Sequence, residues 1–541
     1  MRAPRRICIA AAALLALVCF AYGPALRGGF LWDDDDYVEN NSMLRSAEGL
    51  YRIWTEPGAV PQYYPLVHTL FWIEYHLWGL KTVGYHVVNV LLHFANACLL
   101  GVVLRRLAVP GAWIAAGLFA LHPVMVESVA WITEAKNTLS TAFYLAAILA
   151  YAKFARWDEP EAPGAAPRWR DYALANAFFI AALLSKSITC TLPVALLLIA
   201  WWKRPRLNWK SDLHPLIPMF VLSLAMGLVT AGVEREHVGA GGPDWDFGPG
   251  ERILIAGRAV VFYAEKLIAP VNLCFIYPRW KIDAGSGAQW VYPVVVVGLI
   301  LALWLARRRI GKGPLVAALL FVGTLGPALG FINYFPMLFS FVADHFQYLA
   351  SAAVLAGIAA ALARWGGRVA PLAACALFLL LAFLSHERAK AFRDGETLWR
   401  DTLAKNDSAW LAHNNLGLIL MSQEKWDDAI AHFHHALGIK PGDAAMLNNQ
   451  GLAWLRKGDP SRALVLFVAA VDSQPFFDPP MRNALRALTD PRLSVADNVR
   501  ASEALGQIYE REGVHDIAQM FLKRAQAARA TEAAGKSPRR P

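Results

Sequence analysis

The stretch I-C-I-A-A-A-A-L-L-A-L-V-C-F-A-Y, residues 7–22, is apolar throughout, and F-L-W-D-D-D-D follows it at residues 30–36. An apolar run of this length predicts a helix that crosses a membrane. The four aspartates then lie at the edge of the bilayer, where carboxylates are costly to place and commonly functional. The alternative for an isolated acidic run is a solvated turn that ends the helix.

The composition excludes a soluble enzyme. Of the 541 residues, 56% are hydrophobic and 17% are charged, and apolar runs long enough to cross a bilayer recur up to residue 384. The formal charge of +10 could suggest a nucleic-acid partner. The basic residues cluster in short loops between apolar runs, however, so we expect no nucleic acid. The six cysteines include no C-x-x-C pair, so neither a disulfide framework nor a zinc site is expected.

Membrane crossings, about eleven of them, are predicted from apolar runs of suitable length. Alternate loops carry Lys and Arg, and basic loops are the cytoplasmic ones. This predicts a multi-pass protein of a bacterial inner membrane, with a cytoplasmic N-terminus and a periplasmic C-terminus. The charged stretch 252–270 would break the alternation, so we expect it to lie in the interface or to re-enter the bilayer. The predicted spans are 7–24, 84–106, 111–131, 137–155, 171–185, 188–203, 213–231, 290–306, 314–333, 343–363 and 369–384.

This orientation places several polar segments on the same outer face of the membrane. Independent polar groups that converge on one side of a membrane protein indicate a site there. The segments are Asp33–Asp36, 122–136, Ser185–Ser187, the loop around Asp244, and Asp344.

The last part of the chain repeats with a period of 34 residues. Gly417 and Phe433 recur as Gly451 and Phe467 in the same register, and a looser copy follows near Gly506. This spacing predicts tetratricopeptide repeats, which stack paired helices and bind peptides or partner proteins. The predicted organisation is a membrane domain at 1–385 that includes a first periplasmic loop at 25–83, a connecting half-repeat helix at 386–409, repeats at 410–532 and a disordered basic tail at 533–541.

Six blocks in series resemble the transmembrane and tetratricopeptide repeat-containing protein O-mannosyltransferases and their bacterial relatives. They are F-L-W-D-D-D-D-Y-V-E-N-N (30–41), Y-Y-P-L-V-H-T-L (63–70), G-Y-H-V-V-N-V-L-L-H (84–93), L-F-A-L-H-P-V-M-V-E-S-V-A-W-I-T-E-A-K-N (118–137), L-L-S-K-S (183–187) and V-A-D-H-F-Q-Y-L (342–349). The resemblance implies an all-α chain, with a polytopic GT-C glycosyltransferase domain before the repeat solenoid. It also implies a polyprenyl-phosphate-linked sugar as the donor.

The resemblance further implies a set of site residues. By position in the blocks these are Asp33, Asp34, His122, Glu127, Lys186, Asp344, His345 and Tyr348. His345 and Phe346 stand where eukaryotic members of the family have Arg and Tyr. That difference removes a permanent cation from the last block.

The expected chemistry needs a base and a cation. Asp33 or Asp34 would take the proton of a Ser or Thr hydroxyl as it attacks the anomeric carbon, with inversion. A cation would stabilise the departing lipid phosphate. Lys186 is the first candidate for that cation, followed by Arg279 and Lys136.

Other roles and ligands are also predicted for the acidic residues. Glu127 or Asp344 would orient the acceptor or the sugar hydroxyls. No cofactor is expected, although Asp33 and Glu127 are of the residue type that binds Mg²⁺ or Mn²⁺. Structural alternatives exist as well: Lys186 could extend from a helix end, Glu127 could pair with Lys136, and His122 could mark a kink.

The predicted function is therefore transfer of a sugar, mannose or another hexose, to Ser/Thr hydroxyls of periplasmic proteins. The expected partners are the lipid bilayer, the polyprenyl-phosphate sugar, and protein or peptide acceptors held by the repeats. Two alternatives stay open. One is a GT-C transferase that acts on a cell-envelope lipid or glycan, and the other is a non-catalytic scaffold that recruits partners through its repeats.

Overall fold

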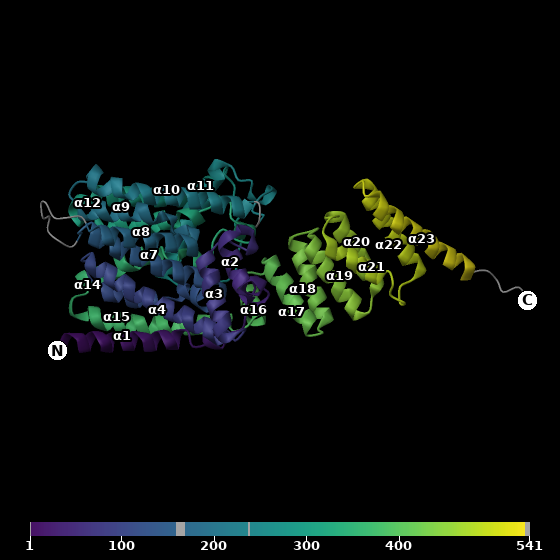
Figure 1. Ribbon diagram of the computed structural model, residues 1–541, viewed down its shortest axis with the longest axis horizontal. Coiled ribbons are helices and arrows are strands. Elements are labelled where there is room, and N and C mark those ends of the chain that lie inside the picture. Colours follow the sequence, from purple (N-terminus) through teal and green to yellow (C-terminus); the bar gives the residue numbers. More distant parts are fainter. Residues whose placement is uncertain (1, 158–167, 236–238, 536–541) are drawn as a thin grey trace, which may run out of the picture. The chain divides into compact units, whose positions relative to one another are not determined.

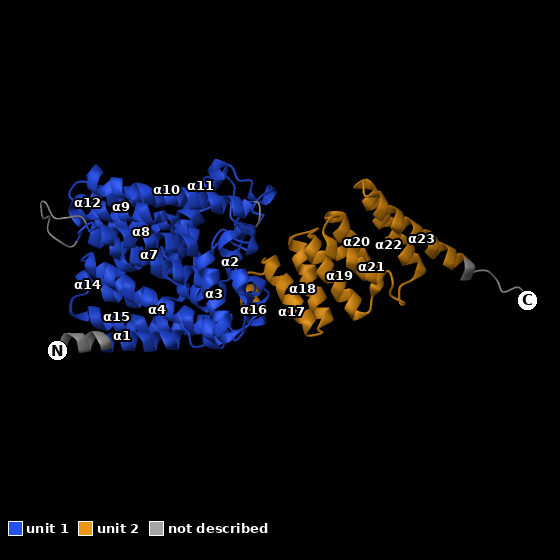
Figure 2. Ribbon diagram, viewed as in Figure 1, with its two compact units in different colours: residues 1–398 blue, residues 399–541 orange. Residues whose placement is uncertain are grey.

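The structure is a computed structural model that describes residues 2–157, 168–235 and 239–535. Every regular element in those ranges is helical (Figure 1), which confirms the predicted all-α class. The chain divides into two compact units, residues 1–398 and 399–541 (Figure 2). The boundary falls inside α16 (Gly395–Lys405), within the predicted connecting segment.

The first unit contains the apolar helices and the acidic run. Its helices are α1 (Arg2–Ala21), α2 (Ala47–Thr55), α3 (Pro65–Trp78), α4 (Thr82–Arg106), α5 (Ala112–Leu121), α6 (Val126–Ala130), α7 (Ala135–Phe154), α8 (Trp169–Ser185), α9 (Leu192–Lys203), α10 (Ile217–Val233), α11 (Pro249–Ile268), α12 (Val291–Ile310), α13 (Gly313–Leu325), α14 (Ser351–Trp365) and α15 (Ala370–Ala389).

Four helical segments of the described chain are long and apolar enough to cross a membrane. They are Thr82–Arg106, Trp209–Val233, Gly287–Ile310 and Gly367–Phe392, and the bent pair Ala112–Leu121 and Pro123–Ala130 would make a fifth. Other predicted spans coincide with shorter apolar helices of 10–17 residues, or with α1 and α7, which are each 20 residues long. A multi-pass membrane protein is thus supported, with four or five segments that meet both the length and the composition of a span.

The stretch 252–270 forms α11, which is not among the helices that qualify as spans. Charged residues interrupt its apolar sequence, as expected of a segment that does not cross. The structure therefore agrees with the prediction that this stretch is not a full span.

The acidic run folds into a turn instead of extending the first helix. Trp32 has φ 45°, a left-handed conformation that is uncommon for residues other than glycine. The Asp34 N–H then donates to the Leu31 carbonyl at 2.9 Å, and a π-helical turn covers Asp35–Glu39. Asp34 is fully buried and Asp35 is exposed, so the alternative of a solvated acidic turn applies to only part of the run.

The segment after α5 is buried although it is not a continuous helix. Every residue from Ala115 to Thr138 is buried. Helix α5 stops before Pro123, because the residue that precedes a proline is disfavoured in the helical region. The chain bends by 55° there, so the predicted kink at His122 is confirmed. Such a bend lets short buried turns carry polar side chains into the interior of the unit.

The second unit confirms the predicted repeats. Helices α17 (Trp410–Ser422) and α18 (Trp426–Ile439) form one pair, and α19 (Ala444–Lys457) and α20 (Pro460–Ser473) form the next. A Cβ added at Gly451 would lie 2.6 Å from the buried Phe467 ring. Glycine is therefore required where the paired helices approach closely.

The end of the array differs from the prediction in two ways. The looser third copy is the pair α22 (Val495–Arg511) and α23 (His515–Gly535), and an additional helix, α21 (Asp478–Ala487), precedes it. Because α23 runs to Gly535, the disordered tail does not begin at residue 533. The rest of the predicted tail, 536–541, lies outside the described residues.

Candidate functional site

A cavity of about 210 Å³ in the first unit brings together segments that are distant in the sequence. It lies beside the turn that carries the aspartates and the buried stretch before α7. The residues that line it are Trp32, Asp33, Asp36, Tyr37, Pro61, Gln62, Glu127, Trp131, Glu134, Lys136, Phe275, Ile276, Phe335, Pro336, Phe339, Ser340, Val342, Ala343, His345 and Phe346.

The two aspartates expected to include the base have different environments. Asp33 lines the cavity and is half-buried. Burial raises its pKa to about 6, and the nearby Lys136 ammonium opposes that rise. Near neutral pH this carboxylate is ionised and close in pKa to the working pH, as a general base requires.

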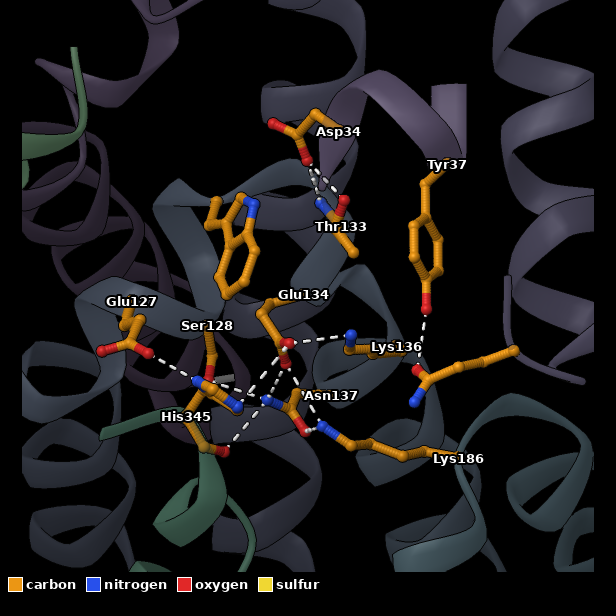
Figure 3. Close-up of polar contacts among 12 residues, drawn as sticks. Asp34, Tyr37, Glu127, Ser128, Thr133, Glu134, Lys136, Asn137, Lys186 and His345 are labelled. Atoms are coloured by element: carbon orange, nitrogen blue, oxygen red, sulfur yellow. Dashed lines mark hydrogen bonds and ion pairs between the residues drawn. The ribbon is translucent and has the colours of Figure 1, made fainter. Parts of the chain in front are cut away.

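Asp34 holds the acidic turn in place. Its carboxylate accepts hydrogen bonds from the Thr133 N–H at 2.7 Å and the Thr133 hydroxyl at 2.5 Å (Figure 3). It also accepts a hydrogen bond from the Leu31 N–H at 2.8 Å. Burial raises the pKa of Asp34 to about 7, against the hydrogen bonds that favour its charged form. It does not line the cavity. Of the predicted pair, Asp34 is therefore placed to anchor the turn and Asp33 to face the cavity.

Glu134 is the centre of a buried ionic network that the sequence analysis did not identify (Figure 3). Its carboxylate lies 3.0 Å from Lys136 Nζ and 3.2 Å from Lys186 Nζ, and it accepts a hydrogen bond from the Asn137 amide at 2.5 Å. Burial alone would raise the pKa of Glu134, but His345 and the two lysines outweigh burial and hold it well below its usual value. A charged Glu134 thus fixes both ammonium groups.

The two lysines differ in their position relative to the cavity. Lys136 lines the cavity, with its ammonium 5.1 Å from the centre of the Tyr37 ring. Lys186 is not a lining residue and instead donates to Asn137 Oδ1 at 2.8 Å. Burial lowers the pKa of Lys186 to about 8, with Glu134 opposing. Lys136 is therefore the cation that faces the cavity. Lys186 contacts Glu134 but does not line the cavity.

Glu127 also lines the cavity, but its partner is not the predicted one. His345 Nδ1 lies 2.5 Å from Glu127 Oε1 (Figure 3), whereas Lys136 pairs with Glu134. The predicted structural pairing of Glu127 with Lys136 is therefore wrong. Glu127 and His345 therefore form a hydrogen-bonded pair at the cavity wall.

The remaining predicted residues do not line the cavity. The His122 Nε2–H donates to the Leu267 carbonyl at 3.1 Å and ties α5 to the end of α11. The Tyr348 hydroxyl lies 2.7 Å from His93 Nδ1 in the core. Both side chains are buried. These two residues support the fold around the site and do not reach the space inside it.

Asp344 and Arg279 likewise hold the surrounding loops. Asp344 is buried and accepts a hydrogen bond from the Tyr277 hydroxyl at 3.0 Å. Arg279 donates to the Met337 carbonyl at 3.0 Å and to the Asp244 carbonyl at 2.7 Å. The prediction that Arg279 faces a donor phosphate is not supported, because these hydrogen bonds join loops and Arg279 does not line the cavity.

Aromatic rings form one wall of the cavity. The indoles of Trp32 and Trp131 stack with centres 5.7 Å apart, and Phe275 and Phe339 meet Trp32 edge-on. Faces of such rings suit the apolar faces of a sugar, and they exclude water from the neighbouring charges. Phe275 and Phe339 lie in loops with no motif, so nothing in the sequence identified them in advance.

The described residues do not assemble a metal centre: no group of three or more His, Cys, Asp or Glu side chains is placed to hold an ion. Asp33 and Glu127 both line the cavity, but one oxygen of Glu127 already contacts His345. The other oxygen of Glu127 is buried without a hydrogen-bond partner, so binding of a divalent cation by Asp33 and Glu127 stays a prediction.

These features define a helical membrane protein with a buried ionic cavity and a tetratricopeptide repeat array. A tetratricopeptide repeat family model matches residues 380–444 and 420–476. The protein O-mannosyl-transferase F38B6.6 of Caenorhabditis elegans is 24% identical over 453 residues, or 79% of this chain and 62% of that protein. The human protein O-mannosyl-transferase TMTC1 is 25% identical over 504 residues, or 82% of this chain and 56% of that protein. The resemblance to this family is therefore confirmed.

The similarity is partial in two respects. The chain spans 62% and 56% of the length of the two relatives. Among solved structures, ArnT from Cupriavidus metallidurans bound to undecaprenyl phosphate covers 89% of this chain and 84% of its own, with 15% identity and a TM-score of 0.34. That score does not establish a common fold, so the GT-C architecture continues to rest on the sequence resemblance.

Proposed function

We propose that this chain is a membrane glycosyltransferase that moves a sugar from a polyprenyl-phosphate donor to Ser/Thr hydroxyls of proteins. The observation that carries the proposal is the cavity in which Asp33 and Lys136 line the same space beside stacked indoles. The relatives named protein O-mannosyl-transferases support mannose, or a similar hexose, as the sugar. The basic loops favour the periplasmic face for the reaction.

Asp33 is the general base in this proposal. A serine or threonine hydroxyl becomes a competent nucleophile when a carboxylate removes its proton during attack. The hydroxyl oxygen bonds to the anomeric carbon, the bond from that carbon to the phosphate oxygen breaks, and the proton moves to Asp33. Attack opposite the departing phosphate inverts the configuration of the sugar carbon.

Lys136 stabilises the departing phosphate. Positive charge held in a water-poor site favours the negative charge that grows on a leaving group. Glu134 fixes the Lys136 ammonium at 3.0 Å, so the cation does not have to reorganise during the reaction. The Glu127–His345 pair lies on the same cavity wall, where it is available to orient a sugar hydroxyl.

Transfer from a synthetic polyprenyl-phosphate mannose to a Ser/Thr peptide tests the proposal, with the purified full-length chain in detergent. Asp33→Asn should lower the rate by about 10²–10⁴-fold, the usual cost of losing a general base. The exposed neighbour provides the matched control, since Asp35→Asn should stay near the wild-type rate. A wild-type rate for Asp33→Asn would show that Asp33 is not the general base. Absence of transfer by the wild-type chain would refute the proposed glycosyltransferase activity.

The side of the membrane is checked separately. Alkaline phosphatase fused after residue 400 should be active if the repeats lie in the periplasm. An inactive fusion, together with an active cytoplasmic reporter at the same position, would reverse the proposed topology.

A further inference from the structure

The segment that leads from the last membrane helix towards the repeats packs against the residues before the acidic turn. Helix α15 ends at Ala389, a 3-10 turn covers Lys390–Phe392, and Arg393 follows. We call residues 388–393 the junction segment. The Gly29 N–H donates to the Arg393 carbonyl at 3.0 Å. The chain that enters the acidic turn is therefore bonded to the chain that leads towards the repeats.

The two segments come close because position 28 has no side chain. A Cβ added at Gly28 would lie 3.1 Å from the Phe392 carbonyl oxygen and 2.9 Å from the Ala25 carbonyl oxygen. The Gly28 carbonyl accepts a hydrogen bond from the Thr82 hydroxyl at 2.7 Å. The backbone before the acidic turn is thus fixed by α4 as well as by the junction segment.

Phe392 extends this contact to the wall of the cavity. Its ring is fully buried, and it meets the Phe275 ring edge-on with centres 6.0 Å apart. Phe275 lines the cavity and meets both Trp32 and Trp131 edge-on. The Arg388 guanidinium lies 5.0 Å from the centre of the Phe392 ring, within the range of a cation–π contact. The junction segment therefore also supports the aromatic wall.

Asp33 lies between two anchored points of the chain. Before it, Gly29 is bonded to the junction segment. After it, Asp34 is bonded to Thr133. A catalytic group acts only from the correct position, and a misplacement of about 1 Å can lower a rate about 10²-fold. The bond at Gly29 is thus placed to control where the proposed base lies.

We propose that the junction segment sets the position of Asp33 and of the aromatic wall, with Gly29 and Phe392 as positioning residues. Neither of them lines the cavity, so they act through the acidic turn and through Phe275. The inference rests on the proposed function and adds a structural control of the base. Because the repeats continue directly from this segment, a displacement of the segment would move the base and the wall together.

Substitution of Gly29 in the purified full-length chain tests the backbone bond. Gly29→Pro removes the N–H, and Gly28, with φ −72° and ψ 152°, already has the conformation favoured before proline. The kcat for transfer from polyprenyl-phosphate mannose to a Ser/Thr peptide should fall about 10- to 100-fold. The KM values should stay within about twofold, because the base moves and the binding surfaces do not.

Gly29→Ala is the matched control for that variant. It keeps the N–H, and the added Cβ meets no atom within 4 Å. Both kcat and KM should therefore stay near the wild-type values.

Variants of Phe392 test the same positioning without a backbone change. Phe392→Ala removes the contact with Phe275 and should lower kcat about tenfold, and Phe392→Leu should restore part of the loss by refilling the space. The matched control is Phe179→Ala on α8, since Phe179 is also fully buried and does not line the cavity. It should lower the melting temperature about as much as Phe392→Ala does, and it should leave kcat unchanged.

Hydrogen exchange of residues 30–41 gives a measurement that needs no transfer. The Asp34 and Tyr37 N–H groups donate within the turn, to the Leu31 and Asp33 carbonyls, and they exchange when the turn opens. Gly29→Pro and Phe392→Ala should speed this exchange about three- to tenfold, as expected for the loss of one ordinary contact. Gly29→Ala and Phe179→Ala should leave it unchanged.

The outcomes separate this inference from the proposed function. Unchanged exchange in both Gly29→Pro and Phe392→Ala would overturn the inference, and so would wild-type kcat in both. An equal loss of kcat in Phe179→Ala would also overturn it, because general destabilisation would then explain the effect. If the wild type transfers no sugar while exchange responds as expected, the glycosyltransferase proposal fails and the control of the turn by the junction segment stands.

Discussion

The two units organise their charges in opposite ways. In the first unit, Glu134, Lys136 and Lys186 are buried and pair with one another across distant segments. In the second unit, the side chains of ion pairs such as Arg500–Asp497 are 80% and 32% exposed. Buried pairs are costly to break, whereas exposed ones contribute little. Long-range folding has thus desolvated these charges in the first unit, which is the environment that the proposed transfer chemistry requires.

The largest effect expected from this contrast is that of Glu134→Gln. The change leaves two buried ammonium groups without their shared carboxylate, and breaking a buried pair costs about 3–5 kcal/mol. Transfer should fall as well, because Lys136 is no longer fixed. Thermal unfolding of the full-length chain and the transfer assay measure the two effects.

The matched control lies in the same unit. Glu56→Gln removes the exposed pair between Arg52 and Glu56, whose side chains are 41% and 50% exposed. It should leave both melting and transfer near the wild type. If Glu134→Gln melts like Glu56→Gln, the buried network does not stabilise the unit and its proposed role in fixing Lys136 fails.

A smaller effect is expected from packing in the second unit. Gly451→Ala would place a Cβ 2.6 Å from the Phe467 ring, which is fully buried and cannot move aside. Overpacking typically costs about 1–3 kcal/mol, and the higher helix propensity of Ala offsets about 1 kcal/mol of it. The repeats should therefore melt earlier, while transfer to a short peptide should change little.

A glycine with open space around it sharpens this test. Gly438 lies on α18 and has no atom within 4 Å of an added Cβ, so Gly438→Ala should stabilise the repeats by about 0.5–1 kcal/mol. Opposite signs for the two substitutions are expected. A gain in stability at Gly451 would show that the paired helices are not closely packed.

Local sequence was sufficient for the repeats but not for the site. The 34-residue spacing directly predicted α17 to α20, because each repeat contacts only its neighbours. The acidic run was found from its position after the first apolar segment, and the polar stretch before α7 from the predicted membrane orientation, with the block resemblance in support of both. The separate roles of Asp33 and Asp34 were not predicted. Only the folded chain shows that Thr133 donates a hydrogen bond to the carboxylate of Asp34.

Glu134 was missed for a physical reason. Residues two apart on a helix do not face each other, so the E-A-K sequence did not suggest a pair with Lys136. Glu134 belongs to a short turn that precedes α7, and this turn brings the two side chains together. Its contact with Lys186 spans 52 residues, a distance at which no sequence spacing is informative.

The smallest expected effect completes the comparison between the units. Asp401 and Lys405 on α16 lie 2.6 Å apart at i,i+4, with side chains 25% and 29% exposed, against 1% for Glu134. Asp401→Asn should cost only about 0.3–0.5 kcal/mol, since water and salt screen such a pair. Melting curves at low and high salt measure this, and 1 M salt should remove most of the difference, because the screening length is then about 3 Å. If Asp401→Asn lost as much stability as Glu134→Gln, burial would not distinguish the ion pairs of the two units. The buried charges would then give no reason to place the proposed chemistry in the first unit.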